Sequence, residues 1–256
     1  KMIIDYIYDI VPVVKPQLAY YEMYGIDGMK AFQETVDYAK SKGLLVIADG
    51  KRNDIGSTSK AYSDAFLGRV SLENNKKIPI YDVDCLTVNP YLGIDGIRPF
   101  IDDCIEYNKG IFVLLKTSNK SSGQLQDIET KSGKKNYELI AELIDSWGQE
   151  TIGQNNYSSI GAVVGATYPN EAKALRKILK NAYILVPGYG FQGGSAKDVV
   201  ESFNNDGLGA IVNASRSIMC AYKSELFKDK IPEDKFFEAS RAEALRMRDD
   251  IMNELR

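Results

Sequence analysis

Seven short apolar runs, rich in β-branched residues, recur along the chain and are separated by longer stretches with helical spacing. This alternation predicts repeated strand–helix–strand units, and therefore a parallel sheet covered by helices. The runs expected to form strands are Val11–Val14, Leu44–Ala48, Cys85–Asn89, Ile111–Lys116, Ile160–Val164, Tyr183–Val186 and Ala210–Asn213. The clearest helical stretches are Gly28–Lys42, Asn136–Gly148, Asn170–Lys180 and the charged segment Pro232–Arg256.

Most of the apolar runs end in a polar, glycine or proline cluster, which is the layout of a (β/α)₈ TIM barrel with its chemistry on the loops after the strands. We expect one such α/β domain over residues 1–256. An open doubly wound sheet is the alternative, but it more often carries a glycine-rich loop after its first strand. Seven strands are one short of a closed barrel, and residues 1–10 have the spacing of the helix that precedes a second strand. We therefore expect the first strand to be missing from this chain.

The chain of 256 residues contains no histidine, which removes the commonest metal ligand and the commonest general base. Acid–base chemistry must then use Asp, Glu, Lys, Tyr or Cys. The cysteines Cys85, Cys104 and Cys220 are widely spaced and form no CxxC pair. That spacing favours a reducing, cytoplasmic location and argues against a zinc site. Cys85 lacks a base partner, so we interpret it as a small core residue.

The formal net charge is −3 and the isoelectric point is about 5.3. This balance argues against a nucleic-acid partner. No apolar run reaches the roughly 18 residues that a membrane span requires. We expect the partner to be a small molecule.

A run of alternating charges follows the apolar run Leu44–Ala48. Asp49 and Lys51 are two residues apart, so on an extended chain they share a face, with about 6.6 Å between their Cα atoms. Asp54 follows where the chain turns polar, and Lys15 also comes directly after a predicted strand. In a barrel these side chains would meet as two cations and two anions, which keeps Lys51 protonated as a proton donor. A structural salt-bridge network at the strand end is the alternative.

Two further clusters follow predicted strands. Residues 187–194 form a glycine-rich loop, and Arg216 follows the last apolar run, at the place where barrels commonly bind phosphate. Lys116–Asn119 offers hydroxyl and amide groups suited to the edge of a uracil-like ring, although a serine/threonine turn would also use them. The polar segment Thr117–Lys135 is a candidate mobile loop or lid.

These motifs resemble those of the orotidine 5′-phosphate decarboxylase family, in particular its longer bacterial branch. Its Asp-x-Lys-x-x-Asp-Ile signature is present as Asp49, Lys51, Asp54 and Ile55, followed by residues 56–58, Gly-Ser-Thr. The resemblance extends in order over nearly the whole chain. Its other segments are Lys15–Glu22, Thr87–Gly93, Lys116–Asn119, Pro187–Gly190 and Asn213–Arg216.

The resemblance implies decarboxylation of orotidine 5′-monophosphate to uridine 5′-monophosphate, the last step of de novo pyrimidine synthesis. Lys51 would protonate C6 as carbon dioxide leaves, and Asp49 would lie against the departing carboxylate. Lys15 would contact the ribose and bridge the two aspartates. The family uses no metal and no organic cofactor.

The resemblance also implies a homodimer, because Asp54 would reach the active site of the neighbouring subunit with Ile55 and Thr58 beside it. Ser118 would bond the pyrimidine edge, and Gln192 and Arg216 would hold the phosphate. The implied substrate-binding residues are Ile55, Thr58, Ser118, Pro187, Gln192 and Arg216.

One family feature is absent, and two other functions stay open. The family ends its first strand in a ribose-binding Gly-Leu-Asp-Pro sequence, which does not precede Lys15 here. Either that segment is missing from this chain, which we prefer, or ribose binding differs. The alternative enzyme is a magnesium-dependent 3-keto-gulonate 6-phosphate decarboxylase built on the same charge motif. The alternative without catalysis is a nucleotide-binding sensor or scaffold.

Overall fold

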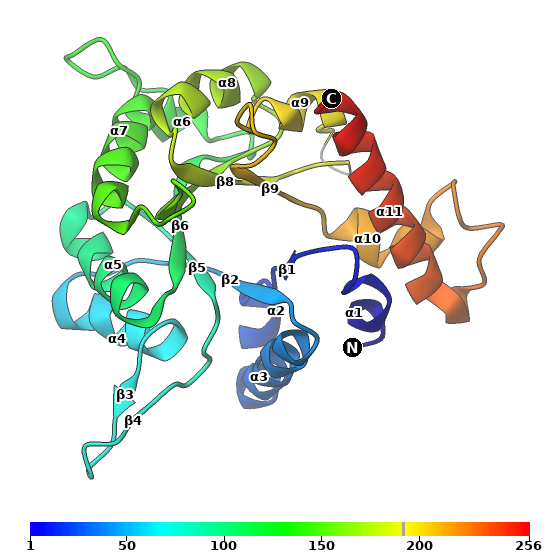
Figure 1. The fold of residues 1–256 in the computed structure, drawn as a ribbon, viewed down its shortest axis with the longest axis horizontal. Coiled ribbons are helices and arrows are strands. Elements are labelled where there is room, and N and C mark those ends of the chain that lie inside the picture. The colour runs from blue at the N-terminus through cyan, green and yellow to red at the C-terminus, as the bar shows by residue number, and fades with distance from the viewer. Residues whose placement is uncertain (191–192) are drawn as a thin grey trace.

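The computed structural model describes residues 1–190 and 193–256. Seven strands form one curled parallel sheet in the order β1-β2-β5-β6-β7-β8-β9 (Figure 1). Their bounds are β1 (Val13–Val14), β2 (Leu45–Arg52), β5 (Cys85–Val88), β6 (Gly110–Lys116), β7 (Ser158–Val164), β8 (Ala182–Pro187) and β9 (Ala210–Asn213). The predicted α/β architecture is therefore confirmed.

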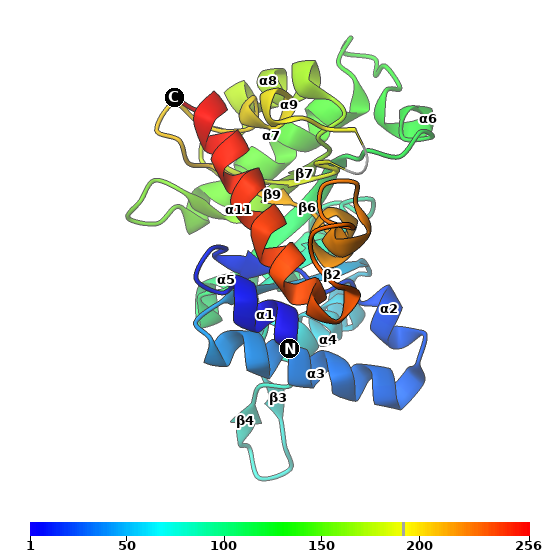
Figure 2. The same cartoon turned by 90° about the vertical axis from the view of Figure 1, so that its right-hand side faces the viewer.

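Helices α3, α4, α5, α7, α8 and α11 form a ring outside the sheet in Figure 1, and α1 lies beside α11 in Figures 1 and 2. The helices are α1 (Met2–Ile7), α2 (Ala19–Glu22), α3 (Gly25–Ser41), α4 (Gly56–Phe66), α5 (Ile94–Tyr107), α6 (Gly123–Gln126), α7 (Asn136–Gly148), α8 (Pro169–Ile178), α9 (Ala196–Val200), α10 (Arg216–Met219) and α11 (Phe236–Glu254). Within the described ranges, no helix combines the length and apolar character needed to cross a membrane.

The hydrophobic core has two layers because strand side chains alternate between the faces of the sheet. Val46 and Ala48 of β2 point outward into the large cluster between sheet and helices. Ile47 points inward and shares a cluster with three inner side chains from β6, β7 and β8, which are Phe112, Val163 and Leu185. The same alternation directs Asp49 to the inner side, at the carboxyl end of β2.

The predicted strand positions agree with the structure, but the end expected for the second strand was wrong. We expected a strand over Leu44–Ala48, whereas β2 continues through the charged residues to Arg52. The continuation is a bulge: Ala48 pairs with Leu86 and Arg52 with Val88, so the register against β5 shifts between them. Charged side chains made the segment resemble a loop, but backbone pairing with β5 holds it in the sheet.

Two parts of the topology differ from a simple closed barrel. Strands β1 and β9 are the two edges of the sheet, and among the described residues no strand joins one to the other. A small antiparallel hairpin of β3 (Val70–Ser71) and β4 (Lys77–Ile78) projects away from the barrel in both views. The hairpin was not predicted, because two-residue strands leave too short a pattern in the sequence.

Candidate active site

Asp49 is the centre of the candidate site, because four side chains donate hydrogen bonds to its carboxylate. Lys15 Nζ and Gln17 Nε2 donate to Oδ2 at 2.5 and 3.0 Å. Lys51 Nζ and the Thr87 hydroxyl donate to Oδ1 at 2.6 and 2.9 Å. Each carboxylate oxygen is thus held by one ammonium group and one neutral donor.

The local fold explains why these groups converge. After β1 the chain stays beside β2, since the Asp49 N–H donates to the Pro16 carbonyl and the Leu18 N–H donates to the Asp49 carbonyl. This places Lys15 next to Asp49. Gly50 between the two charged residues leaves room for the buried Leu18, whose Cδ1 would lie 2.6 Å from a Cβ at that position.

The electrostatic environment keeps Asp49 ionised. Burial acts to raise the pKa of this carboxyl group, but the charges and hydrogen bonds of Lys15 and Lys51 outweigh burial and lower the pKa below its ordinary value. The side chains of Lys15 and Asp49 are each only 10% exposed, whereas the Lys51 side chain is 44% exposed. Lys51 is therefore the cation of this array that solvent or a ligand can reach.

A cleft of about 470 Å³ opens above this array. Lys15, Asp49, Lys51 and Thr87 line one part of it, and the inner-layer side chains Leu114, Val163 and Leu185 also contribute. The rest of the lining consists of Pro187, Leu125 and polar side chains from residues 117–126, among them Ser118. A charged corner, apolar floor and polar wall suit a polar ring that carries an anionic group.

The polar wall is fixed to the barrel by several contacts. Lys116 is almost fully buried, and its ammonium donates to Asp127 at 2.5 Å. The Thr117 N–H donates to Gln126 Oε1 at 3.0 Å. Ser118 packs on the backbone of Gly165, where a Cβ would approach the Ser118 Cβ to 2.8 Å. These contacts keep Ser118 at the cleft, while the mobility expected of Thr117–Lys135 stays a prediction.

The loop after β8 and the start of α10 lie next to each other. Tyr189 is buried, and its hydroxyl donates to Asp250 of α11 at 2.5 Å. Burial and this hydrogen bond both raise the pKa of the Tyr189 hydroxyl. A Cβ at Gly190 would meet the Ser217 Oγ at 2.8 Å, so the neighbouring Arg216 stands at the edge of this loop. The predicted phosphate ligand Gln192 lies outside the described residues.

Asp54, Ile55 and Thr58 are not among the described residues that line the cleft of their own chain. The Asp54 carboxylate accepts a hydrogen bond from the Ile55 N–H at 2.8 Å. Ile55 and Thr58 are exposed at the start of α4. Their position on the surface leaves them available to another molecule.

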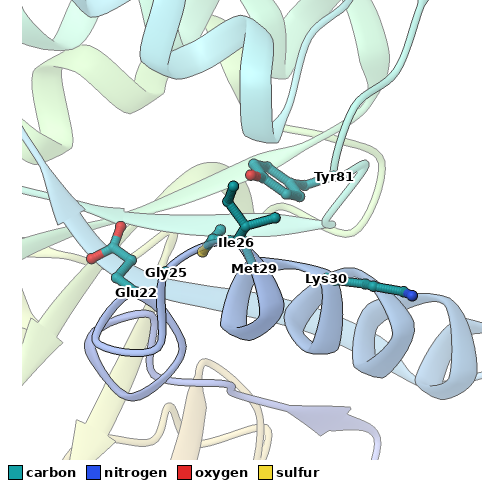
Figure 3. Close-up of a pocket in the computed structure, with 6 residues that line it drawn as sticks. All are labelled: Glu22, Gly25, Ile26, Met29, Lys30 and Tyr81. Atoms are coloured by element: carbon teal, nitrogen blue, oxygen red, sulfur yellow. The ribbon is translucent and has the colours of Figure 1, made fainter.

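A second, more open pocket of about 550 Å³ lies on α3 (Figure 3). In Figure 3, Ile26 and Met29 of α3 lie toward Tyr81, which comes from the segment before β5. Its mainly apolar lining has no counterpart of the Asp49 array, so we assign the chemistry to the cleft around Asp49. The pocket residues are Glu22, Gly25, Ile26, Met29, Lys30 and Tyr81.

Sequence reasoning missed two members of the Asp49 array, Gln17 and Thr87, because neutral side chains on a strand or after one carry no distinctive signal. It correctly set aside Cys85: burial raises the pKa of that thiol to about 12, so it is a neutral thiol near pH 7.

Over residues 1–190 and 193–256, no group of three or more acidic or cysteine side chains is arranged to hold a metal ion.

Comparison with known proteins identifies the family of this chain. The model of the orotidine 5′-phosphate decarboxylase / HUMPS family matches residues 1–225. The chain belongs to this family. A curated orotidine 5′-phosphate decarboxylase of Caldicellulosiruptor saccharolyticus is 46% identical over 229 residues, which are 90% of this chain and 74% of the relative.

Two further orotidine 5′-phosphate decarboxylase relatives extend the match to almost the whole chain. The protein of Rhodopirellula baltica is 44% identical over 249 residues, covering 97% of this chain and 81% of that protein. The solved structure of OMP decarboxylase from Leishmania donovani superposes with a TM-score of 0.76 at 26% identity, covering 99% of this chain and 84% of that one. The fold and the family expected from the sequence are thereby confirmed.

Proposed function

We propose that this chain decarboxylates orotidine 5′-monophosphate to uridine 5′-monophosphate, with Lys51 as the proton donor. The observation that carries the proposal is the Asp49 carboxylate, held ionised between two lysines at the charged corner of a cleft. The family match and the curated relatives named orotidine 5′-phosphate decarboxylase support the same reaction.

The proton that the reaction requires comes from the Asp49 array. The bond between C6 and the carboxylate carbon breaks, carbon dioxide leaves, and the electron pair stays at C6. The Lys51 ammonium delivers a proton to that carbon and regains one from solvent. Lys51 suits this role because its ammonium is fixed at 2.6 Å from Asp49 while its side chain stays open to the cleft.

Asp49 contributes through its charge. A substrate carboxylate placed about 4 Å from it would be repelled by roughly 4 kcal/mol at an effective dielectric constant near 20. Loss of carbon dioxide removes that repulsion, which corresponds to about a thousandfold in rate. Binding energy from the distant phosphate offsets the cost of bringing the two anions together.

The remaining predicted residues would hold the substrate along the cleft. Lys15 would contact the ribose, and Ser118 on the polar wall would bond the edge of the pyrimidine. Pro187 lines the cleft where β8 ends, on the way to the glycine-rich loop. Arg216 and Gln192 would bind the phosphate at that end.

We also propose that the active form is a homodimer in which Asp54 serves the partner's site. Exposed large apolar side chains support this: α2, the start of α3, the start of α4 and the segment around the start of α5 carry them, and Ile26 is 89% exposed. Where such side chains gather on a surface they mark interaction sites. These residues are Tyr20, Met23, Tyr24, Ile26, Ile55, Tyr91, Leu92 and Ile94.

Mixing two inactive variants tests the shared site. If Lys51 and Asp54 of different subunits form one site, then Lys51→Ala and Asp54→Ala chains together form hybrid dimers with one intact site each. After exchange of subunits in an equal mixture, half of the dimers are hybrids, and each hybrid has one intact site out of two. About a quarter of wild-type activity should therefore return. Activity that stays absent in verified hybrid dimers would contradict the shared site.

A spectrophotometric assay of orotidine 5′-monophosphate loss tests the function itself. We expect turnover by the purified protein, retained after dialysis against a chelator because the proposed chemistry uses no metal or organic cofactor. Magnesium-dependent turnover of 3-keto-gulonate 6-phosphate would favour the alternative enzyme. Binding of uridine 5′-monophosphate without turnover would favour a sensor or scaffold.

A further inference from the structure

Thr87 occupies an unusual position opposite the bulge of β2. Ala48 pairs with Leu86 and the next pair in register is Arg52 with Val88. Three residues of β2, 49–51, therefore stand opposite a single residue of β5, Thr87. Bulges of this kind redirect a side chain, and they are common next to active sites.

The backbone of the bulge is held in a conformation that a side-chain-bearing residue rarely adopts. Lys51 has a φ of +49°, in the left-handed region, where the Cβ atom crowds the following carbonyl group. Such a conformation persists only where surrounding contacts impose it. The Lys51 N–H donates to the Thr87 hydroxyl at 2.9 Å, and that bond joins the strained residue to the neighbouring strand.

The Thr87 hydroxyl also donates its single proton to Asp49 Oδ1, at 2.9 Å. Lys51 Nζ donates to the same oxygen at 2.6 Å. The directions are fixed, because an ionised carboxylate only accepts and a backbone N–H only donates. One buried hydroxyl, 1% exposed, thus connects the carboxylate to the backbone of the residue that carries the ammonium group.

We propose that Thr87 is a positioning residue that fixes the Lys51 ammonium relative to the Asp49 carboxylate. Thr87 acts through Lys51, and this role rests on the proposed decarboxylation. Without the hydroxyl, the bulge loses its bond to β5 and the ammonium group leaves the place where C6 receives its proton. A displacement of about 1 Å at a reacting group is worth roughly a hundredfold in rate. The loss falls on kcat, since the phosphate and base contacts are made elsewhere in the cleft.

Two pairs of variants isolate the hydroxyl. Thr87→Val keeps the volume of threonine and removes the hydroxyl, whereas Thr87→Ala and Thr87→Ser differ from each other only in the hydroxyl. We expect kcat to fall about 10- to 100-fold in the valine and alanine variants, with the serine variant within about threefold of wild type. The affinity for uridine 5′-monophosphate should stay within about threefold in every variant.

Thr151 supplies a control. Like the Thr87 hydroxyl, its hydroxyl accepts from a backbone N–H, that of Ser159 at 3.2 Å, but it donates to a carbonyl, that of Gly148 at 2.9 Å, and lies 2.7 Å from the Ser158 hydroxyl. Thr151 lies before β7, at the amino end of the sheet and outside the cleft lining. Thr151→Val should therefore lower the melting temperature without changing kcat.

Hydrogen exchange of the Lys51 amide, followed by NMR, gives a readout that does not depend on turnover. We expect strong protection in the wild-type and serine variants and loss of protection in the valine and alanine variants. Unchanged kcat in a folded valine or alanine variant would overturn the proposal, and so would an equal loss of kcat in the serine variant. If the wild-type protein fails to decarboxylate orotidine 5′-monophosphate, the proposed function fails, whereas the exchange data still decide whether Thr87 holds the bulge.

Discussion

Two carboxylates in this molecule are surrounded by cations, at opposite ends of the sheet. Asp49, near the carboxyl end of β2, accepts from Lys15 and Lys51. Asp82, just before the amino end of β5, accepts hydrogen bonds from three cations in three separate parts of the chain. These donors are Lys40 at 2.8 Å, Arg69 at 3.2 Å and Lys109 at 3.0 Å.

The difference between the Asp49 array and the Asp82 cluster lies in what surrounds them. The Asp49 array opens into a cleft, and one of its cations, Lys51, is accessible there. The Asp82 cluster ties the end of α3, the segment after α4 and the start of β6 together, and its members line neither of the two described pockets. In barrels the carboxyl end carries chemistry and the amino end stability. We therefore expect similar ion pairing to serve catalysis at the carboxyl end of the sheet and stability at the amino end.

The largest expected effect is the contrast between Lys51, in the Asp49 array, and Lys40, in the Asp82 cluster. Lys51→Ala should lower kcat by a thousandfold or more, at the upper end of the ~10²–10⁴ range for a general acid, while uridine 5′-monophosphate still binds. Lys40→Ala, at the Asp82 cluster, should leave kcat unchanged and lower the melting temperature. Steady-state kinetics with thermal unfolding of both variants measures the contrast. Near-normal turnover of the Lys51 variant would contradict a catalytic role for the Asp49 array.

A pair of arginines should show a smaller contrast of the same kind. Arg216→Ala is expected to lower kcat/KM by about a hundredfold, mainly by raising KM, because a charge-assisted contact to the phosphate is lost. Arg69→Ala, at the Asp82 cluster, should leave kcat/KM unchanged. Kinetics with orotidine, which lacks the phosphate, checks the cause: the Arg216 substitution should then have almost no effect. An equal penalty with both substrates would contradict the phosphate role.

Asp82→Asn should lower the free energy of unfolding by about 1–2 kcal/mol, between the values typical of exposed and buried ion pairs. Asparagine is a suitable replacement because Asp82 has a φ of +49°, which asparagine tolerates well. The substitution then removes the charge and exchanges one acceptor oxygen for an amide group. Denaturant unfolding measures the stability, and kcat should match that of the wild type. A lower kcat in the fully folded variant would show that the amino end of the sheet also contributes to catalysis.

The smallest effect concerns acid pH. Burial acts to raise the pKa of Asp82, but hydrogen bonds from Lys40 and Lys109 outweigh it and lower the pKa from 3.8 to about 2. A lowered pKa means that the ion pairs stabilise the fold fully above pH 4 and that this contribution is lost as the pH falls towards 2. Between pH 4 and 2 the wild type should therefore lose more stability than Asp82→Asn does. If the free energy of unfolding falls equally with pH in both proteins over this interval, the lowered pKa of Asp82 is contradicted.

The sequence predicts the repeating framework and the charged members of the site because both leave strong patterns. Ala210–Asn213 and Asn136–Gly148 were predicted with the bounds that the structure has. The positions of Lys15, Asp49 and Lys51 at one cleft follow from the rule that parallel strands end at the same edge. Family resemblance was needed for Asp54, since its proposed role depends on a second chain.

What the sequence does not predict are features created by pairing between strands. Thr87 and Gln17 are neutral residues whose importance arises only when β5 and the segment after β1 come to lie beside Asp49. The left-handed conformation of Lys51 is equally hidden, because lysine has no preference for it. Such features depend on partners distant in the chain, and local propensity carries no information about them.

The bulge in β2 has a consequence for how the gene can be altered. Its spacing matches three residues to one on β5, so deletion of a single codon within 49–51 would rotate every later side chain of the strand to the opposite face. The hairpin of β3 and β4, which projects into solvent, has no such constraint and should accept inserted tags or linkers. Tolerance to insertions and deletions thus changes sharply within some thirty residues of chain.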